Sequence, residues 1–480
     1  MNYKMIKYIL GSLLKIESIL LAIPLLVSII YQENNLLYFL IPIILCLTIG
    51  WLMTIKKPIN HSIYTKESFL ITALAWIVFS FFSTLPFYLS KEIPNFTNAF
   101  FETVSGLSTA GSTILMDVES LSNSMLFLRS FNQWIGGMGI LVFALMIIPQ
   151  TDAKSLQLMK AEVPGPIVGK LVSRIKRTAR ILYLIYTIMS VIMMMLLYMA
   201  GMPIFDSIVN TFAIAGTGGF AIKNASLAYY NSAYIEMLVA VFILLFGMNF
   251  HLFYLVITKK TLKAFKSEEL KYYLLIIIGA VILIMFNTAN IFTNIFESFR
   301  YVFFTVTSII TTTGFVTIDY NNWPVFSQTV IFFLMFIGGC AGSTAGGLKI
   351  SRFIILLKLG VSNIKKVLHP HGISSLKFEN KKVDINTLSA IASYFILYIV
   401  IMAISLLLIS LDQFDFKSNL SAVVSSLNNI GPGLNKFGPI EHYAELTDLS
   451  KWVLIFNMLL GRLEIIPILL IFLPSTWRKH

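Results

Sequence analysis

The chain has 480 residues, of which 57% are hydrophobic and 12% are charged, and its mean hydropathy is +0.81. A soluble domain carries about a quarter charged residues, so this composition excludes an ordinary soluble protein and indicates a polytopic helical membrane protein. The net charge of +13 would suggest a nucleic-acid partner in a soluble protein, but in a membrane protein basic residues gather at cytoplasmic boundaries instead.

Ten stretches are long and apolar enough to cross a bilayer as helices of about 20 residues. We expect spans near 8–31, 36–55, 68–90, 125–149, 180–200, 233–257, 272–289, 325–355, 386–411 and 449–474. Lysines and arginines cluster after the even-numbered spans, for example Lys56 and Lys57 after the second, whereas the opposite connections carry acids such as Asp319. The positive-inside rule therefore places both termini in the cytoplasm and explains the charge without nucleic acid.

Four connections on the acidic side, after the third, fifth, seventh and ninth spans, are unusually apolar. They contain FTNAFFETVSGLSTAGST, FDSIVNTFAIAGTGGFA, FESFRYVFFTVTSIITTTGF and LSAVVSSLNNIGPG. Each is too apolar for a solvated loop and too short to cross the membrane twice as helices. Each has an amphipathic stretch, a turn containing Ser, Thr or Asn, and then a glycine: Gly111, Gly219, Gly314 and Gly431. We therefore predict four short helices that dip into the membrane, each followed by an extended return.

These segments recur at similar intervals, which indicates an internal repeat of span, half-helix, loop and span. The predicted fold is an all-α polytopic membrane protein with ten transmembrane helices and four re-entrant pore loops in a pseudo-fourfold arrangement. Residues 1–60 form two transmembrane helices outside the repeat, and the four pore repeats occupy 61–153, 175–262, 268–360 and 384–480.

The four loops suggest an ion pathway. Non-helical backbone at membrane depth persists only inside protein or along a water-filled cavity. Four such loops around one axis could turn carbonyl oxygens inward and replace the hydration shell of a small cation. Glycine reaches the required backbone angles without the cost that a Cβ imposes, and the C-terminal end of an inward-running half-helix favours a cation. Close helix packing is the alternative use of Gly, Ser and Thr, but four loops on one side favour the ion pathway.

Several motifs point to a known family: FFETVSGLSTAGST, RSFNQWIGGMGILVF, GTGGF, TTTGF, IGGCAGSTAGGLKISR, NNIGPG and GRLEI. Over essentially its whole length the chain resembles TrkH-type subunits of the Trk/Ktr/HKT superfamily of potassium transporters. The resemblance implies a potassium filter built from one glycine per repeat and the carbonyls of the two preceding residues. The filter residues would be Thr109, Ala110 and Gly111; Thr217, Gly218 and Gly219; Thr312, Thr313 and Gly314; Asn429, Ile430 and Gly431. Ala110 departs from the family's usual threonines, but a backbone carbonyl needs no hydroxyl.

Two features lie deeper in the membrane. The run GGCAGSTAGG breaks the eighth span and contains Gly338, Gly339, Gly342, Gly346 and Gly347, and Arg462 lies in the tenth span. At about 1.5 Å per residue, both are about 20 Å inward from the outer end. A charge at that depth is costly and faces a cavity or a partner, and the family that the chain resembles has an intramembrane loop and an arginine below its filter. We expect the loop and Arg462 to form a gate that obstructs the pathway at rest.

Two other charges have structural interpretations. Glu464 is two positions from Arg462 and therefore lies on a different helix face, so we expect it to pair with another helix. Arg129 lies near the outer end of the fourth span, where a structural salt bridge or snorkelling is expected.

A secondary transporter is the main alternative, because such proteins also have repeats and broken helices. Here all four loops enter from the same side, but a symporter that couples potassium to protons or sodium stays open. An enzyme is not expected, since the sequence has no HExxH motif, no GxSxG before a helix and no P-loop.

The resemblance also implies the setting and the partners. It implies a homodimer in the lipid of the bacterial cytoplasmic (inner) membrane, and a TrkA-like cytoplasmic ring of nucleotide-binding domains as the regulatory partner. The chain itself has no dinucleotide fingerprint, and we expect no cofactor in it, with K⁺ as the transported ion. The predicted function is passive potassium uptake through the four-loop filter.

Overall fold

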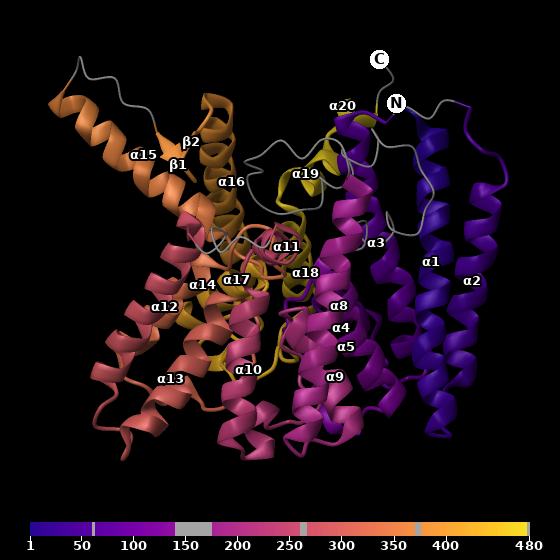
Figure 1. Cartoon of the computed structure of the whole chain (residues 1–480). Coiled ribbons are helices and arrows are strands. Elements are labelled where there is room, and N and C mark those ends of the chain that lie inside the picture. Colours follow the sequence, from indigo (N-terminus) through magenta and orange to yellow (C-terminus); the bar gives the residue numbers. More distant parts are fainter. Residues whose placement is uncertain (60–62, 140–174, 260–265, 370–375, 478–480) are drawn as a thin grey trace.

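The computed structural model describes residues 1–59, 63–139, 175–259, 266–369 and 376–477, and this part of the chain is mostly helical (Figure 1). The helices are α1 (Tyr3–Ile30), α2 (Leu36–Thr54), α3 (Thr65–Leu89), α4 (Phe96–Leu107), α5 (Asn123–Met138), α8 (Ile175–Met199), α9 (Ile204–Ala215), α10 (Ala233–Phe246), α11 (Phe250–Lys259), α12 (Glu268–Asn287), α13 (Ile295–Ile310), α14 (Val325–Ile337), α15 (Ile350–Leu368), α16 (Ile385–Ile409), α17 (Phe416–Asn428), α18 (Asp448–Leu463), α19 (Ile466–Phe472) and α20 (Pro474–Trp477). The strands β1 (Lys377–Phe378) and β2 (Lys381–Lys382) pair antiparallel.

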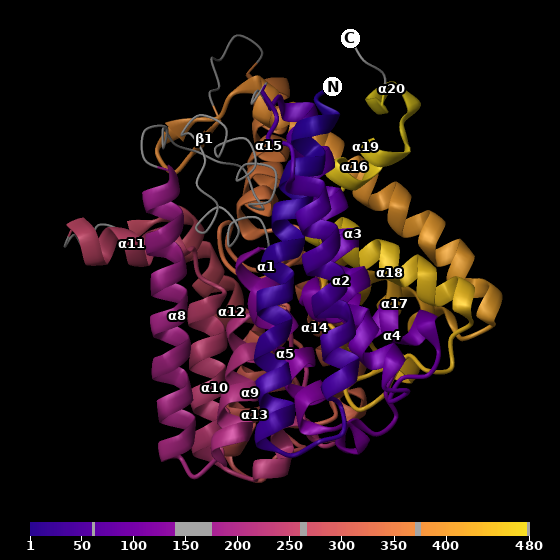
Figure 2. The ribbon, with the colours of Figure 1, turned by 90° about the vertical axis from the view of Figure 1, so that its right-hand side faces the viewer.

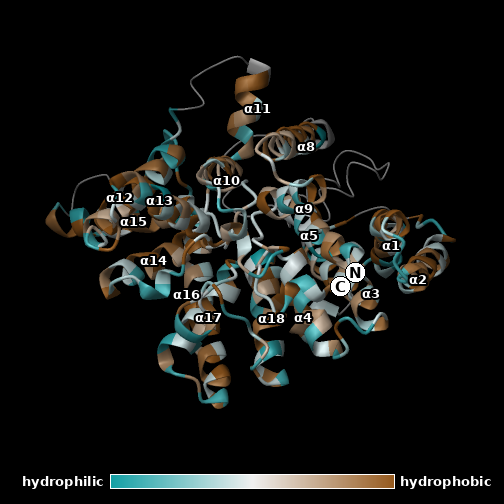
Figure 3. Ribbon diagram, turned by 90° about the horizontal axis from the view of Figure 1, so that it is seen from below, coloured by the Kyte–Doolittle hydropathy of each residue, from teal (hydrophilic) through white to brown (hydrophobic). Residues whose placement is uncertain are grey.

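Six of the described helices are long and apolar enough to cross a bilayer, namely α1, α2, α3, α8, α12 and α16. The pair α1 and α2 lies at one side of the molecule (Figure 3), and both chain termini lie at the same end (Figure 1). The span predicted at 125–149 begins as α5, whereas residues 140–149 lie outside the described part of the chain.

The span predicted at 233–257 is not one helix. It bends by 87° between α10 and α11, and α11 projects sideways from the bundle (Figure 2). At the bend the Gly247 carbonyl accepts a hydrogen bond from Cys340 N–H (3.0 Å), and Phe250 N–H donates to the Gly342 carbonyl (3.1 Å). The loop between α14 and α15 thus satisfies backbone groups that a continuous helix would satisfy itself.

Two other predicted spans are also divided. The span at 325–355 separates into α14 and α15 at Gly338–Lys349, where the glycine run predicted a break. The span at 449–474 separates into α18 and α19, because Glu464 and Ile465 have φ angles of 66° and 60° that no right-handed helix accepts.

Four short helices, α4, α9, α13 and α17, follow the long helices α3, α8, α12 and α16 along the chain. The side chains of Asn95, Asn294 and Asp415 accept backbone N–H groups at the first turns of α4, α13 and α17, which satisfies donors that a helix start leaves free. Seen from below, the short helices stand around a centre occupied by chain segments without regular structure (Figure 3).

Candidate functional site

The chain leaves all four short helices with one backbone conformation. The glycines Gly111, Gly219, Gly314 and Gly431 have φ angles of 76°, 73°, 82° and 102°. The residues two positions earlier, Thr109, Thr217, Thr312 and Asn429, also have positive φ angles, of 59°, 53°, 56° and 56°. Positive φ is uncommon for any residue other than glycine and rare for a β-branched one. The repetition of this pair of angles is therefore a structural repeat at the level of the backbone.

The hydrogen bonds that end the four helices repeat as well. The residue just before each glycine donates its N–H to the carbonyl five positions earlier. The pairs are Ala110 to Ser105 (2.9 Å), Gly218 to Ala213 (2.9 Å), Thr313 to Ser308 (2.8 Å) and Ile430 to Ser425 (3.0 Å). These bonds satisfy carbonyls of the last helical turn, and each short helix ends three or four residues before its glycine.

The four segments that contain these glycines touch one another in a closed ring. A Cβ built on each glycine would collide with, or crowd, the carbonyl oxygen of the residue before the next glycine. The distances from the built Cβ to the carbonyl oxygen are 2.1 Å for Gly111 and Gly218, 1.9 Å for Gly219 and Thr313, 2.1 Å for Gly314 and Ile430, and 3.0 Å for Gly431 and Ala110. We call these four glycines and carbonyls the glycine ring; the structure brings all twelve filter residues expected from the sequence into it or its immediate neighbourhood.

One face of the glycine ring opens into a cavity of about 150 Å³, and all four glycines line it. Lys223, Glu441 and His442 stand around the same cavity. Lys223 is paired with the exposed carboxylate of Glu119 at 3.1 Å. Hydrogen bonds from Asn224 N–H, which has the larger effect, and from Lys223 hold the pKa of Glu119 below its ordinary value. This pair therefore stays charged at neutral pH.

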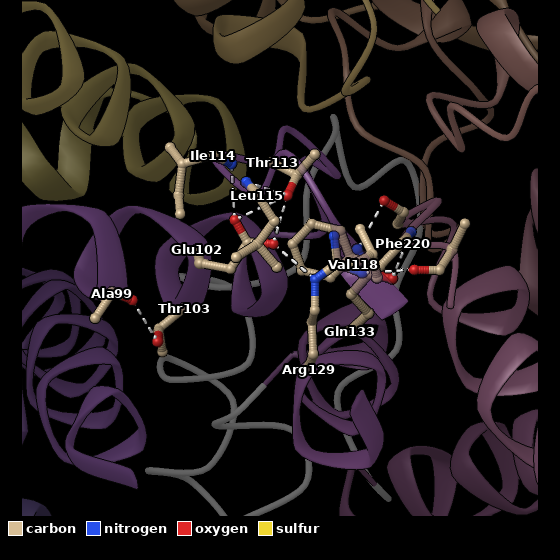
Figure 4. Close-up of polar contacts among 12 residues, drawn as sticks. Ala99, Glu102, Thr103, Thr113, Ile114, Leu115, Val118, Arg129, Gln133 and Phe220 are labelled. Carbon is tan, nitrogen blue, oxygen red and sulfur yellow. Dashed lines mark hydrogen bonds and ion pairs between the residues drawn. The ribbon is translucent and has the colours of Figure 1, made fainter. Parts of the chain in front are cut away.

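A buried ion pair between Glu102 and Arg129 supports the segments that contain Gly111 and Gly219 (Figure 4). The Glu102 carboxylate of α4 accepts hydrogen bonds from Arg129 Nε of α5 (2.6 Å), Thr113 Oγ1 (2.9 Å) and Ile114 N–H (3.0 Å). Arg129 also donates to the Ala221 carbonyl at 2.7 Å. Arg129 therefore forms the structural salt bridge that its position suggested, and it joins the segment of Gly111 to the segment of Gly219.

Arg129→Met is expected to lower the free energy of unfolding by about 3–5 kcal/mol, because it leaves Glu102 as a buried charge without its partner. Arg129→Met combined with Glu102→Gln leaves no such charge and should be more stable than Arg129→Met alone. Denaturant unfolding of the detergent-solubilised protein measures both. Lys223→Met, which breaks the exposed pair with Glu119, is the matched control, and it should lower the free energy of unfolding by only about 0–1 kcal/mol. A double variant less stable than Arg129→Met would contradict the ion-pair account.

Side chains within the third and fourth repeats hold the other two segments. Ser308 Oγ donates to the Phe315 carbonyl (2.7 Å) and Ser425 Oγ to the Gly431 carbonyl (2.7 Å). Both serines lie six positions before their glycine, where the second repeat has Ala213 instead.

Gln133 of α5 supplies the support that the second repeat lacks. Its Nε2 donates to the Gly218 carbonyl at 2.7 Å, and its Oε1 accepts Phe220 N–H at 3.1 Å (Figure 4). Sequence reasoning missed Gln133, whose only signal was a buried amide in the apolar fourth span.

The loop Gly338–Lys349 lies on the side of the glycine ring where the short helices end. Gly346 N–H donates to Thr312 Oγ1 at 2.6 Å, and a Cβ on Gly346 would lie 2.4 Å from the Asn428 carbonyl. The expected loop glycines Gly338, Gly339, Gly342, Gly346 and Gly347 all belong to it, and three of them have φ angles of 72–76°. The loop and the cavity therefore lie on opposite sides of the glycine ring.

Arg462 holds this loop to α5. It is 6% exposed and donates to the Thr344 carbonyl of the loop (2.9 Å) and to the carbonyls of Gly137 (2.6 Å) and Gly136 in α5. Glu464 pairs with Arg352 of α15, which confirms the prediction that it binds another helix.

Another buried basic side chain, that of Lys349, ends the loop. It is 1% exposed, and its Nζ donates to the Ala345 carbonyl of the same loop. Sequence reasoning did not single it out, although its place beside the glycine run in an apolar span was a usable signal.

Comparison with known proteins identifies the family. The family model TrkH, described as a cation transport protein, matches residues 36–479. The Trk system potassium uptake proteins TrkH of Salmonella typhimurium and Escherichia coli are each 36% identical, over 488 and 490 residues, with 100% of both chains covered. The crystal structure of the potassium transporter TrkH from Vibrio parahaemolyticus matches with a TM-score of 0.90 and 31% identity, again covering 100% of both chains. The chain therefore belongs to the TrkH family of cation transport proteins and is a multi-pass membrane transport protein, not an enzyme.

Proposed function

We propose that this protein takes up K⁺ across the bacterial cytoplasmic (inner) membrane through a channel-like filter formed by the glycine ring. The observation that carries this proposal is the closed ring itself, in which each glycine faces the carbonyl oxygen of the next repeat. The relatives named as potassium uptake proteins support K⁺ as the transported ion.

The filter would work through backbone oxygens. Backbone carbonyls among the twelve residues Thr109–Gly111, Thr217–Gly219, Thr312–Gly314 and Asn429–Gly431 would replace water around a dehydrated K⁺. The partly negative C-terminal ends of α4, α9, α13 and α17 lie three or four residues before the glycines and would add a favourable potential for a cation. Glycine fits here because a Cβ on Gly111, Gly219 or Gly314 would lie within 2.1 Å of a neighbouring carbonyl oxygen, and a Cβ on Gly431 would lie 3.0 Å from one.

The transmembrane arrangement follows from the helices. The six apolar helices, α5, and the divided pairs α10–α11, α14–α15 and α18–α19 would supply ten spans, with α4, α9, α13 and α17 leading into four re-entrant pore loops. Repeats at 61–153, 175–262, 268–360 and 384–480 would then surround one pore in a pseudo-fourfold way, with 1–60 outside. Both termini would be cytoplasmic.

The loop Gly338–Lys349 would be the gate. It touches Thr312 and Asn428 on the inner side of the glycine ring, and Arg462 fixes it through the Thr344 carbonyl. The arginine would therefore obstruct K⁺ in two ways, by repelling a cation and by holding the loop under the filter.

Regulation would come from other chains. The last turn of α15 contains the exposed Lys365 and Lys366. The C-terminal end of α15 and the strands β1 and β2 lie toward the end of the molecule where N and C are marked (Figure 1). This end would dock a TrkA-like nucleotide-binding ring. The transporter would be a homodimer in which each chain holds its own pore, since all four repeats belong to one chain.

Binding of K⁺ to the glycine ring is expected to stabilise the folded protein. A ligand that binds only the native state stabilises it by about 2.7 kcal/mol at 100 times its Kd. The thermal unfolding midpoint in detergent should therefore be higher in KCl than in NaCl or choline chloride at equal ionic strength. Equal midpoints in all three salts would contradict a potassium site.

A further inference from the structure

A carboxyl group lies inside the membrane-spanning part of the protein, away from the glycine ring. Glu17 of α1 is 1% exposed. Its Oε1 accepts a hydrogen bond from Ser83 Oγ of α3 at 3.2 Å, whereas its Oε2 has no hydrogen-bond partner among the described residues. No basic side chain forms an ion pair with it in the described part of the chain.

A small cavity lies beside this carboxyl group. Its volume is about 10 Å³, and Glu17, Ser83 and Asn132 of α5 line it together with apolar residues such as Leu21 and Phe131. Asn132 is 2% exposed, and its Nδ2 has no partner among the described residues. Two unpaired polar atoms from two helices thus line one cavity of about the size of a water molecule.

Chemistry limits what this site can hold. An ionised carboxylate in apolar surroundings is very costly unless a cation or several donors satisfy it, so a group in this position takes up a proton instead. A neutral carboxylic acid still leaves an O–H donor and the Asn132 amide unsatisfied. One water can accept from both and donate to Ser83 Oγ, and buried waters typically make about three such bonds.

We propose that Glu17 is held as a neutral carboxylic acid and that, with Ser83 and Asn132, it binds one water molecule at the junction of α1, α3 and α5. The site attaches α1, and with it the N-terminal pair α1 and α2, to α3 and α5 by hydrogen bonds rather than by apolar contact alone. Asn132 of this site precedes Gln133 in the chain, and the Gln133 side chain donates to the Gly218 carbonyl. A titratable group near Glu17 is the buried thiol of Cys46 in α2.

Infrared spectroscopy of the purified full chain at neutral pH tests the protonation state. The difference between the unaltered protein and Glu17→Gln is expected to contain the C=O stretching band of one protonated carboxylic acid. Asn132→Leu should shift this band, because the acid loses its bridged water. Glu119→Gln, which removes the exposed carboxylate paired with Lys223, is the control and should change carboxylate bands only. A Glu17→Gln difference made of carboxylate bands would overturn the proposal.

The water itself has a separate test that needs no variant. A high-resolution experimental structure of the unaltered protein is expected to contain one water within hydrogen-bonding distance of Glu17 Oε2 and Asn132 Nδ2. A map that resolves other internal waters but has no density at this point would overturn the water site. Neither measurement involves ion flux, so either result leaves the potassium proposal to its own tests.

Discussion

Gly219→Ala is expected to reduce potassium flux by more than about tenfold and to weaken the preference for K⁺ over Na⁺. The new methyl group would lie 1.9 Å from the Thr313 carbonyl oxygen, so the ring must shift at that point. The φ angle of 73° adds backbone strain of about 1–3 kcal/mol, and about 1.4 kcal/mol already corresponds to a factor of ten. Flux into proteoliposomes measures the effect, in the unaltered and the Arg462→Gln background, so that a closed gate does not hide it.

Gly201→Ala is the matched control for this variant. Gly201 also has a positive φ angle, 93°, but a Cβ there would have nothing within 4 Å. It therefore carries the same kind of backbone strain without any collision in the glycine ring, and potassium flux should stay within about twofold of the unaltered protein. Equal losses in Gly201→Ala and Gly219→Ala would assign the effect to general strain and contradict the filter.

Arg462→Gln is expected to raise potassium flux through the chain alone by about tenfold or more. The substitution removes a buried positive charge and weakens hydrogen bonds to the Thr344 carbonyl of the loop and the Gly137 carbonyl of α5. A barrier lowered by about 1.4 kcal/mol gives the tenfold change. The measurement is potassium flux into proteoliposomes without any partner protein.

Arg462→Lys separates the two contributions of this arginine. Lysine keeps the charge but lacks the planar fork that binds several carbonyls at once. If repulsion of cations dominates, Arg462→Lys should behave like the unaltered protein; if tethering of the loop dominates, it should resemble Arg462→Gln. A folded Arg462→Gln protein with flux at or below the unaltered level would contradict the gate.

The local backbone of the candidate site could be predicted because it depends on residue type. Glycine marks each place where a Cβ would meet a carbonyl, and Gly314 in TTTGF is the plainest case. The break at Gly338 could also be predicted from residue type, because a run of glycines forms a helix poorly. The positive φ angle of Thr312 was not foreseen, because nothing in a threonine requires it.

Features that depend on distant partners could not be predicted. The apolar pattern continues through Gly247, and only the folded chain supplies Cys340 N–H and the Gly342 carbonyl, which bond to backbone groups at this bend. The support of Gly218 by Gln133 joins residues 85 positions apart. It compensates for Ala213 in a place where Ser308 and Ser425 act within their own repeats.

Cation flux under an imposed voltage tests the central claim most directly. The unaltered chain and Arg462→Gln are reconstituted separately into proteoliposomes without a proton or sodium gradient, and K⁺, Rb⁺ and Na⁺ are compared. The account predicts voltage-driven K⁺ flux that exceeds Na⁺ flux and is larger in Arg462→Gln. Potassium movement that occurs only with a proton or sodium gradient, in both proteins, would contradict the channel-like filter and establish the coupled symporter instead.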